Sequence, residues 1–166
     1  MEEKNKRNAD EVHLSYTFNA PRKAVFKAWT DPAQLAEWYA PHGCTILFKT
    51  LDVRKGGSFL SCVSNPQFGE CWCKGVYTEV VSPERIEYTM IVSDEHGNTV
   101  DPVSAGMHAD WPLETKVSVT FTEDNGKTTV TLHQTVSQKL AKETGAYPSW
   151  IQMLEILEQL LMRDKI

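Results

Sequence analysis

Hydrophobic residues recur along this chain with two different periods, and the changes between them predict the order of its elements. From Val12 to Phe18 every second residue is apolar, which is typical of a half-buried strand. Helical spacing follows, a period of two returns between residues 45 and 136, and helical spacing closes the chain. This order predicts an α+β fold in which a run of antiparallel strands lies between helices.

Two short helices are predicted directly after the first strand. Pro21 stands where the first helical turn tolerates a missing N–H, and apolar residues follow it at helical spacing. Asp31 and Pro32 repeat this start signal as N-cap and first helical residue. The helices are therefore expected to break between Thr30 and Asp31.

Turn residues inside the sheet region fix the expected strand registers. A hairpin that closes at residues 125–126 places Phe121 opposite Val130 and Val119 opposite Leu132. Paired residues share a face of the sheet, so this hairpin has one apolar face and one polar face.

A second hairpin, closing at residues 82–83, places Tyr77 opposite Tyr88. The period of two then puts Cys73 and Met90 on the same face as the two tyrosines.

A third turn, at residues 65–66, predicts by symmetric closure that Cys62 and Leu60 join the face of Cys73. A slip of one residue in any of these hairpins would move the whole set to the other face.

The final segment predicts a strongly amphipathic helix. Its apolar side consists of Trp150, Met153, Leu154, Leu157, Leu160 and Leu161. Because Pro148 disfavours helical geometry at Tyr147, continuous helix is expected only from about Pro148. Residues 138–144 form either a separate turn or a kinked extension of this helix.

Residues 94–112 show no period and predict a long loop, a kind of segment that is often functional. Within it, His108 and Asp110 stand beside Trp111 and could form an acid/base pair at the mouth of a pocket. Two ionisable residues in a loop are usually solvated, so no catalytic residue is predicted.

Length, composition and charge indicate one ordinary domain. The first ten residues are polar, so we expect a disordered tail over residues 1–10 and a single domain over residues 11–166. The chain shows neither the apolar core of a signal peptide nor a stretch long enough to cross a membrane, which predicts a cytoplasmic protein without integral membrane contact. A net charge of -5 argues against nucleic acid as a partner.

The four cysteines, Cys44, Cys62, Cys71 and Cys73, could carry metal or thiol chemistry. A reducing compartment would keep them as thiols. Cys71 and Cys73 form a C-x-C pair, which even together with His108 is a weak match to the ligand spacing of zinc sites. We therefore expect Cys62, Cys71 and Cys73 to be small buried residues, and we predict no metal and no cofactor.

Five segments carry a resemblance to known proteins: APRKAVFKAWTDPAQLAEWYAP, DVRKGGSF, GVYTEVVSPERIEYT, TTVTLHQ and SWIQMLEILEQLL. Their order and spacing resemble the helix-grip superfamily of START-like (SRPBCC), polyketide-cyclase and plant-allergen-like proteins. Within it, the chain resembles the activator of heat-shock protein 90 ATPase homologue family, over about residues 12–162. The resemblance implies a curved antiparallel sheet of seven strands wrapped around the last helix, with the two short helices closing one end.

A sheet that grips a helix encloses a pocket, and apolar walls with a few polar groups are typical of small-molecule sites. The candidate ligand-binding residues are Trp38, Cys73, Tyr77, Tyr88, Met90, His108, Trp111, Phe121, Trp150, Met153 and Leu154. The alternative for each of them except His108 is that it fills the core, and for His108 it is that water solvates it in the loop.

Three functions follow from these observations. The first hypothesis is a non-enzymatic binding module that holds a small hydrophobic or amphipathic molecule between sheet and helix. The second, implied by the resemblance alone, is a protein-interaction domain that stimulates a heat-shock protein 90 chaperone. The third is a small cyclase- or hydrolase-like enzyme that uses the same pocket, as enzymes of the wider superfamily do.

Overall fold

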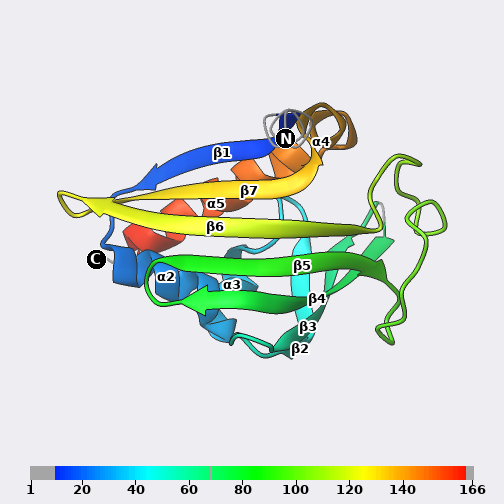
Figure 1. The fold of residues 1–166 in the computed structure, drawn as a ribbon, viewed down its shortest axis with the longest axis horizontal. Coiled ribbons are helices and arrows are strands. Elements are labelled where there is room, and N and C mark those ends of the chain that lie inside the picture. The colour runs from blue at the N-terminus through cyan, green and yellow to red at the C-terminus, as the bar shows by residue number, and fades with distance from the viewer. Residues whose placement is uncertain (1–9, 68, 164–166) are drawn as a thin grey trace, which may run out of the picture.

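The computed structural model describes residues 10–67 and 69–163, which form a curved seven-stranded antiparallel sheet around a long helix (Figure 1). The strands are β1 (Glu11–Phe18), β2 (Thr45–Leu51), β3 (Ser58–Asn65), β4 (Gly69–Val81), β5 (Arg85–Ser93), β6 (Glu114–Asp124) and β7 (Lys127–Ser137). The helices are α2 (Arg22–Thr30), α3 (Pro32–Trp38), α4 (Gln138–Thr144) and α5 (Ala146–Arg163). The strand order is β1-β7-β6-β5-β4-β3-β2, and the predicted helix-grip fold is confirmed.

The predicted tail falls on residues that, apart from Asp10, lie outside the described ranges, and β1 begins at Glu11. No helix within the described ranges is both long and apolar enough to cross a membrane.

The C-terminal region consists of two separate helices. Gly145, at φ 89°, adopts the left-handed conformation that ends α4, and α5 begins at Ala146. The expected start at Pro148 was therefore two residues too late. A proline is tolerated there because the N–H groups of the first helical turn have no partner within the helix. The apolar side of α5 is buried as predicted, with Leu154 and Leu157 fully covered.

The two short helices after β1 are confirmed and close one end of the sheet (Figure 1). The Asp31 side chain caps α3 by accepting a hydrogen bond from the Ala33 N–H at 3.2 Å. The Trp38 indole of α3 donates to the Ala28 carbonyl of α2 at 2.9 Å, and this hydrogen bond connects the two helices. Their tryptophan rings, Trp29 and Trp38, meet edge to face at 4.7 Å.

Two of the three predicted hairpin registers are confirmed. Phe121 pairs with Val130, and Tyr77 pairs with Tyr88. The apolar set of these strands accordingly faces α5, and Val117 and Val119 on β6 are fully buried in that core.

The third register was wrong. Asn65 pairs with Gly69, so Cys62 lies opposite Trp72 and Leu60 opposite Lys74 on the outer face of the sheet. The connection is centred further along the chain than residues 65–66, and the odd shift in pairing turns each side chain to the other face. Ser61, not Cys62, is the residue that pairs with Cys73.

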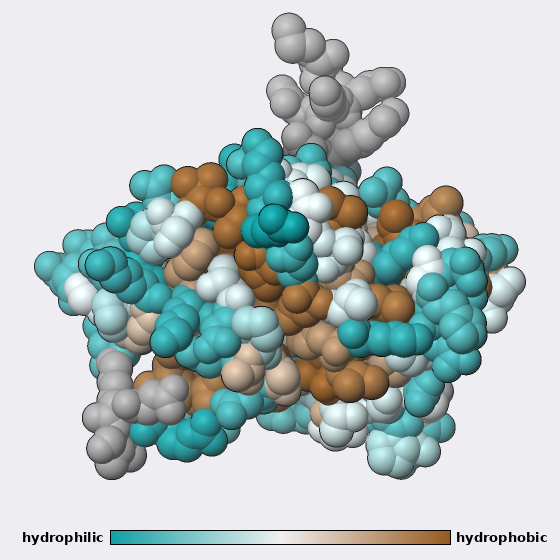
Figure 2. All heavy atoms as spheres, turned by 90° about the horizontal axis from the view of Figure 1, so that it is seen from below, coloured by the Kyte–Doolittle hydropathy of each residue, from teal (hydrophilic) through white to brown (hydrophobic). Residues whose placement is uncertain are grey.

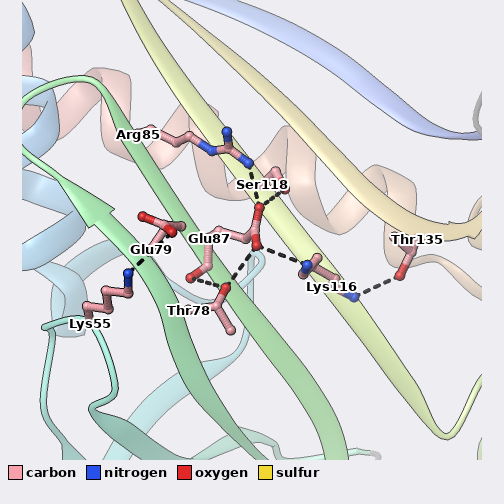
Figure 3. A network of polar contacts seen from close by, with 8 residues as sticks. All are labelled: Lys55, Thr78, Glu79, Arg85, Glu87, Lys116, Ser118 and Thr135. Carbon is pink, nitrogen blue, oxygen red and sulfur yellow. Dashed lines mark hydrogen bonds and ion pairs between the residues drawn. The ribbon is translucent and has the colours of Figure 1, made fainter.

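The outer face carries a buried carboxylate, Glu87, held by four donors (Figure 3). Thr78 Oγ1 and Lys116 Nζ each lie 3.0 Å from Oε1, while Arg85 Nη2 and Ser118 Oγ lie 2.6 and 3.2 Å from Oε2. Burial by itself raises the pKa of this carboxyl, but the hydrogen bonds from its neighbours outweigh burial and lower the pKa to about 2.

A glutamine at position 87 is expected to lower the free energy of unfolding by up to about 3 kcal/mol at neutral pH, because the ionised form is the one these donors stabilise. Since the folded-state pKa lies below the ordinary value of 4.5, this contribution is present above pH 4.5 and is lost as the pH falls toward 2. Urea unfolding of wild type and Glu87→Gln across this pH range should therefore show a difference in the free energy of unfolding that becomes smaller as the pH falls.

The matched control is Glu79→Gln, since Glu79 is more exposed and its carboxylate lies 3.7 Å from Lys55 Nζ. It is expected to change stability by less than about 0.5 kcal/mol. Equal losses of unfolding free energy in the two variants would contradict a stabilising role of the ionised Glu87. A difference between wild type and Glu87→Gln that does not depend on pH would contradict its lowered pKa.

Candidate functional site

A small cavity lies inside the grip of the sheet, beneath the two short helices. Its wall consists of Trp29, Leu35, Tyr39, Phe48, Phe59, Tyr77, Ile86 and Tyr88. The cavity volume is about 10 Å³, close to the least that holds one water molecule. The site is therefore apolar, aromatic and nearly closed in this conformation.

The wall carries a cluster of three phenols. The hydroxyls of Tyr39 and Tyr88 are hydrogen-bonded at 2.5 Å, and the rings of Tyr77 and Tyr88 lie 5.5 Å apart. Burial raises the pKa of all three hydroxyls, and for Tyr88 the neighbouring Tyr39 raises it further. The cluster is therefore uncharged at neutral pH.

The indole of Trp29 adds a further polar group. Its Nε1 is the one buried side-chain nitrogen or oxygen in residues 10–67 and 69–163 that lacks a hydrogen-bond partner. By contrast, the indoles of Trp38, Trp72 and Trp150 all donate to an oxygen at 2.9 to 3.2 Å. A buried N–H without an acceptor is rare in folded proteins and calls for an explanation.

A chain of buried polar groups fixes α5 against the sheet. The Trp150 indole donates to Gln134 Oε1 at 2.9 Å, and Gln134 Nε2 donates to Thr115 Oγ1 at 3.1 Å. At the other end of the helix, the Tyr16 hydroxyl of β1 donates to the Glu158 carboxylate. These contacts set the position of the helix that the sheet encloses.

Comparison with known families identifies the chain. The family model described as "Activator of Hsp90 ATPase homolog 1-like protein" matches residues 19–162. The chain belongs to this family. A comparison with curated proteins gives no match.

Solved structures of other proteins share the fold of this AHSA1-like chain. A protein from Arthrobacter aurescens has a TM-score of 0.79 at 21% identity, covering 95% of this chain and 88% of its own. One from Staphylococcus epidermidis has a TM-score of 0.76 at 25% identity, covering 93% and 91%. The AHSA1 protein of Silicibacter pomeroyi has a TM-score of 0.72 at 18% identity, covering 93% and 99%.

The fold of this AHSA1-like chain separates the predicted site residues into four groups. Tyr77 and Tyr88 line the cavity. Others are buried in the core around it, namely Trp38, Phe121, Trp150, Met153 and Leu154, while Cys73, Met90 and Trp111 pack against that core from partly exposed positions. His108 lies on the exposed part of the loop between β5 and β6.

Six wall residues were not predicted: Trp29, Leu35, Tyr39, Phe48, Phe59 and Ile86. Their apolar periodicity assigns them to the core, yet it does not reveal which core positions surround a void. Gly75 is the one sequence signal near the wall that could have pointed to Phe59. It leaves space for the Phe59 ring, which lies directly over it.

The loop histidine does not form a buried acid/base pair. His108 Nδ1 accepts a hydrogen bond from the Asp110 N–H at 3.0 Å and lies 4.0 Å from Asp110 Oδ2. The two side chains are 43% and 81% exposed, so water solvates both.

The cysteines lie in three different environments. Cys62 is buried on the outer face, Cys73 is partly buried, and Cys71 is exposed, contrary to its predicted burial. Cys71 stands near the turn of the β3–β4 hairpin, one residue beyond Trp72, where the pairing of β4 with β5 ends. Burial raises the pKa of Cys73 to about 12, so it is a thiol. Within the described ranges, no three His, Cys, Asp or Glu residues are placed to hold a metal ion.

Hydrophobic residues gather across the middle of the face that carries β2 and α3, between hydrophilic margins (Figure 2). Leu47 on β2 is 59% exposed. Three wall residues of the cavity, Leu35, Tyr39 and Phe48, come from α3, its C-cap and β2. The cavity therefore lies behind the elements of this hydrophobic face.

Proposed function

We propose that this AHSA1-like protein is a non-enzymatic binding module that holds a small hydrophobic or amphipathic molecule between the sheet and α5. The observation that carries the proposal is the composition of the cavity wall. Apolar and aromatic side chains surround a few polar groups, as in small-molecule sites generally.

Binding requires the cavity to enlarge, since about 10 Å³ holds no more than a water molecule. The segment that we propose to move is Tyr39, the C-cap residue of α3, which leaves helical geometry at ψ 49°. Movement of this segment would open the cavity toward the hydrophobic face of β2 and α3. We thus propose that the protein has a closed form, which a ligand converts into an open one.

A holding role suits the wall better than a catalytic one. None of its eight residues is a carboxylate, an imidazole, a lysine or an arginine. General acid–base catalysis needs a group whose pKa lies near the operating pH, and burial raises the pKa of the three phenols away from it.

A ligand panel in a thermal-denaturation assay tests this proposal. Uncharged aromatic compounds should stabilise the wild type by about 2.7 kcal/mol at a hundred times the dissociation constant. Leu35→Phe fills the cavity from α3 and should abolish the stabilisation, while Leu47→Phe makes the same change at an exposed site and should preserve it. Stabilisation of all three proteins alike would contradict binding in the cavity.

A second proposal is the co-chaperone role named in the family description, which rests on the match over residues 19–162. In this role the protein would bind a heat-shock protein 90 chaperone and stimulate its ATPase. An ATPase assay with purified chaperone tests it, and no stimulation at micromolar protein would contradict it.

A further inference from the structure

We propose that the cavity selects uncharged molecules with an accessible hydrogen-bond acceptor, such as a carbonyl oxygen, and that the Trp29 indole N–H is the donor that recognises it. This inference rests on the proposed function and specifies the chemistry of its ligand. Three observations support it: an unused donor, further O–H donors in the wall, and the absence of charge.

The unused donor is the strongest of these observations. Trp29 is 2% exposed and lines the cavity, so bulk water does not reach its N–H. An indole N–H donates only and cannot serve as an acceptor. A ligand that brings an acceptor into the cavity would form the missing hydrogen bond with the Trp29 N–H. Ligands without an acceptor leave this buried N–H without a partner, so the site should discriminate strongly against them.

The phenols add O–H donors to the wall. One proton is used in the hydrogen bond between Tyr39 and Tyr88, so the hydroxyl that accepts it retains its own proton for donation. The Tyr77 hydroxyl is a further donor on the wall. The wall therefore offers O–H and N–H groups to a ligand acceptor, and the Trp29 indole is the one among them that can only donate.

The absence of charge excludes ionised ligands. No cationic side chain belongs to the wall, so a carboxylate that entered the cavity would lose its hydration without gaining a counter-ion. The cavity should reject an anion even when its shape matches that of a neutral ligand.

Three probes of similar shape separate these features: 2-acetylnaphthalene, 2-ethylnaphthalene and 2-naphthoate. The ketone is expected to bind the wild type roughly 5- to 20-fold more tightly than the hydrocarbon, because only the ketone accepts the Trp29 hydrogen bond. The carboxylate should bind more weakly than either. Calorimetric titration of each probe measures the three dissociation constants.

Two variants locate the donor. Trp29→Phe removes the N–H and should bring the affinity for the ketone to about that for the hydrocarbon, whose own affinity changes little. The control Trp72→Phe removes an indole on the outer face and should leave the preference intact. In the wild type, the indole N–H resonance of Trp29 should move on addition of the ketone and not of the hydrocarbon, a test that does not depend on the variant folding.

The possible outcomes distinguish a failure of the Trp29 donor assignment from a failure of the binding module. Equal binding of ketone and hydrocarbon by the wild type, or an unmoved Trp29 resonance, would overturn the donor assignment while leaving the binding module standing. Absence of binding by all three probes would overturn the binding module together with the inference. Tightest binding of the carboxylate would overturn the exclusion of charge.

Discussion

Gly75→Ala is expected to lower the free energy of unfolding by roughly 3 to 5 kcal/mol. A Cβ at this position would lie 1.8 Å from the carbonyl oxygen of Thr89 and 2.5 Å from the ring of Phe59. Backbone of β5 and a wall residue of the cavity would both have to shift. Because the nearest atom is a backbone carbonyl oxygen of β5, the clash cannot be relieved by a flexible side chain alone.

Urea unfolding measures this loss, with Val76→Ala as the control on the same strand. Val76 is 42% exposed on the outer face, so its truncation should cost less than about 1 kcal/mol. A Gly75→Ala protein of near wild-type stability would show that β4 and β5 can separate locally without cost.

Gln134→Leu is expected to destabilise the protein by roughly 2 to 4 kcal/mol, although leucine is apolar and similar in size. The change removes the acceptor of the Trp150 indole and the donor to the Thr115 hydroxyl. Trp150 and Thr115 stay buried, at 5% and 2% exposure, and each loses the hydrogen-bond partner that Gln134 provides. The cost is therefore the desolvation of two polar groups rather than the loss of packing.

The comparison variant is Thr131→Val, which removes a hydroxyl from an exposed position on the same strand. It should change stability by less than about 0.5 kcal/mol. A loss below about 1 kcal/mol for Gln134→Leu would mean that water reaches the Trp150 indole, and the buried chain would not be what positions α5.

The fold was predictable from sequence because strong local signals agree with the global arrangement. Asn125 and Gly126 specify a tight hairpin, and the register of Phe121 followed from it. The connection after Asn65 has no comparable signal, since Pro66 marks a turn without fixing its length. A connection of different length moved Leu60 and Cys62 to the outer face.

The site was less predictable than the fold. Periodicity assigns Trp29 and Leu35 to the buried side of their helices, but the position of a cavity depends on how α2 and α3 pack on the sheet. The same tertiary packing leaves the Trp29 N–H without a partner while giving Trp38 the Ala28 carbonyl. Two tryptophans on adjacent helices, alike in sequence pattern, thus differ in whether the indole N–H has a hydrogen-bond partner, which is the property that the proposed binding depends on.

The most direct test of the central claim is native mass spectrometry of wild type and Leu35→Phe, mixed in equal amounts with excess 2-acetylnaphthalene. The two proteins differ in mass, so one spectrum reports the occupancy of each under identical conditions. We expect a complex of one ligand with the wild type and unliganded Leu35→Phe. Equal occupancy of both proteins, or a ligand on neither, would contradict a binding site between the sheet and α5.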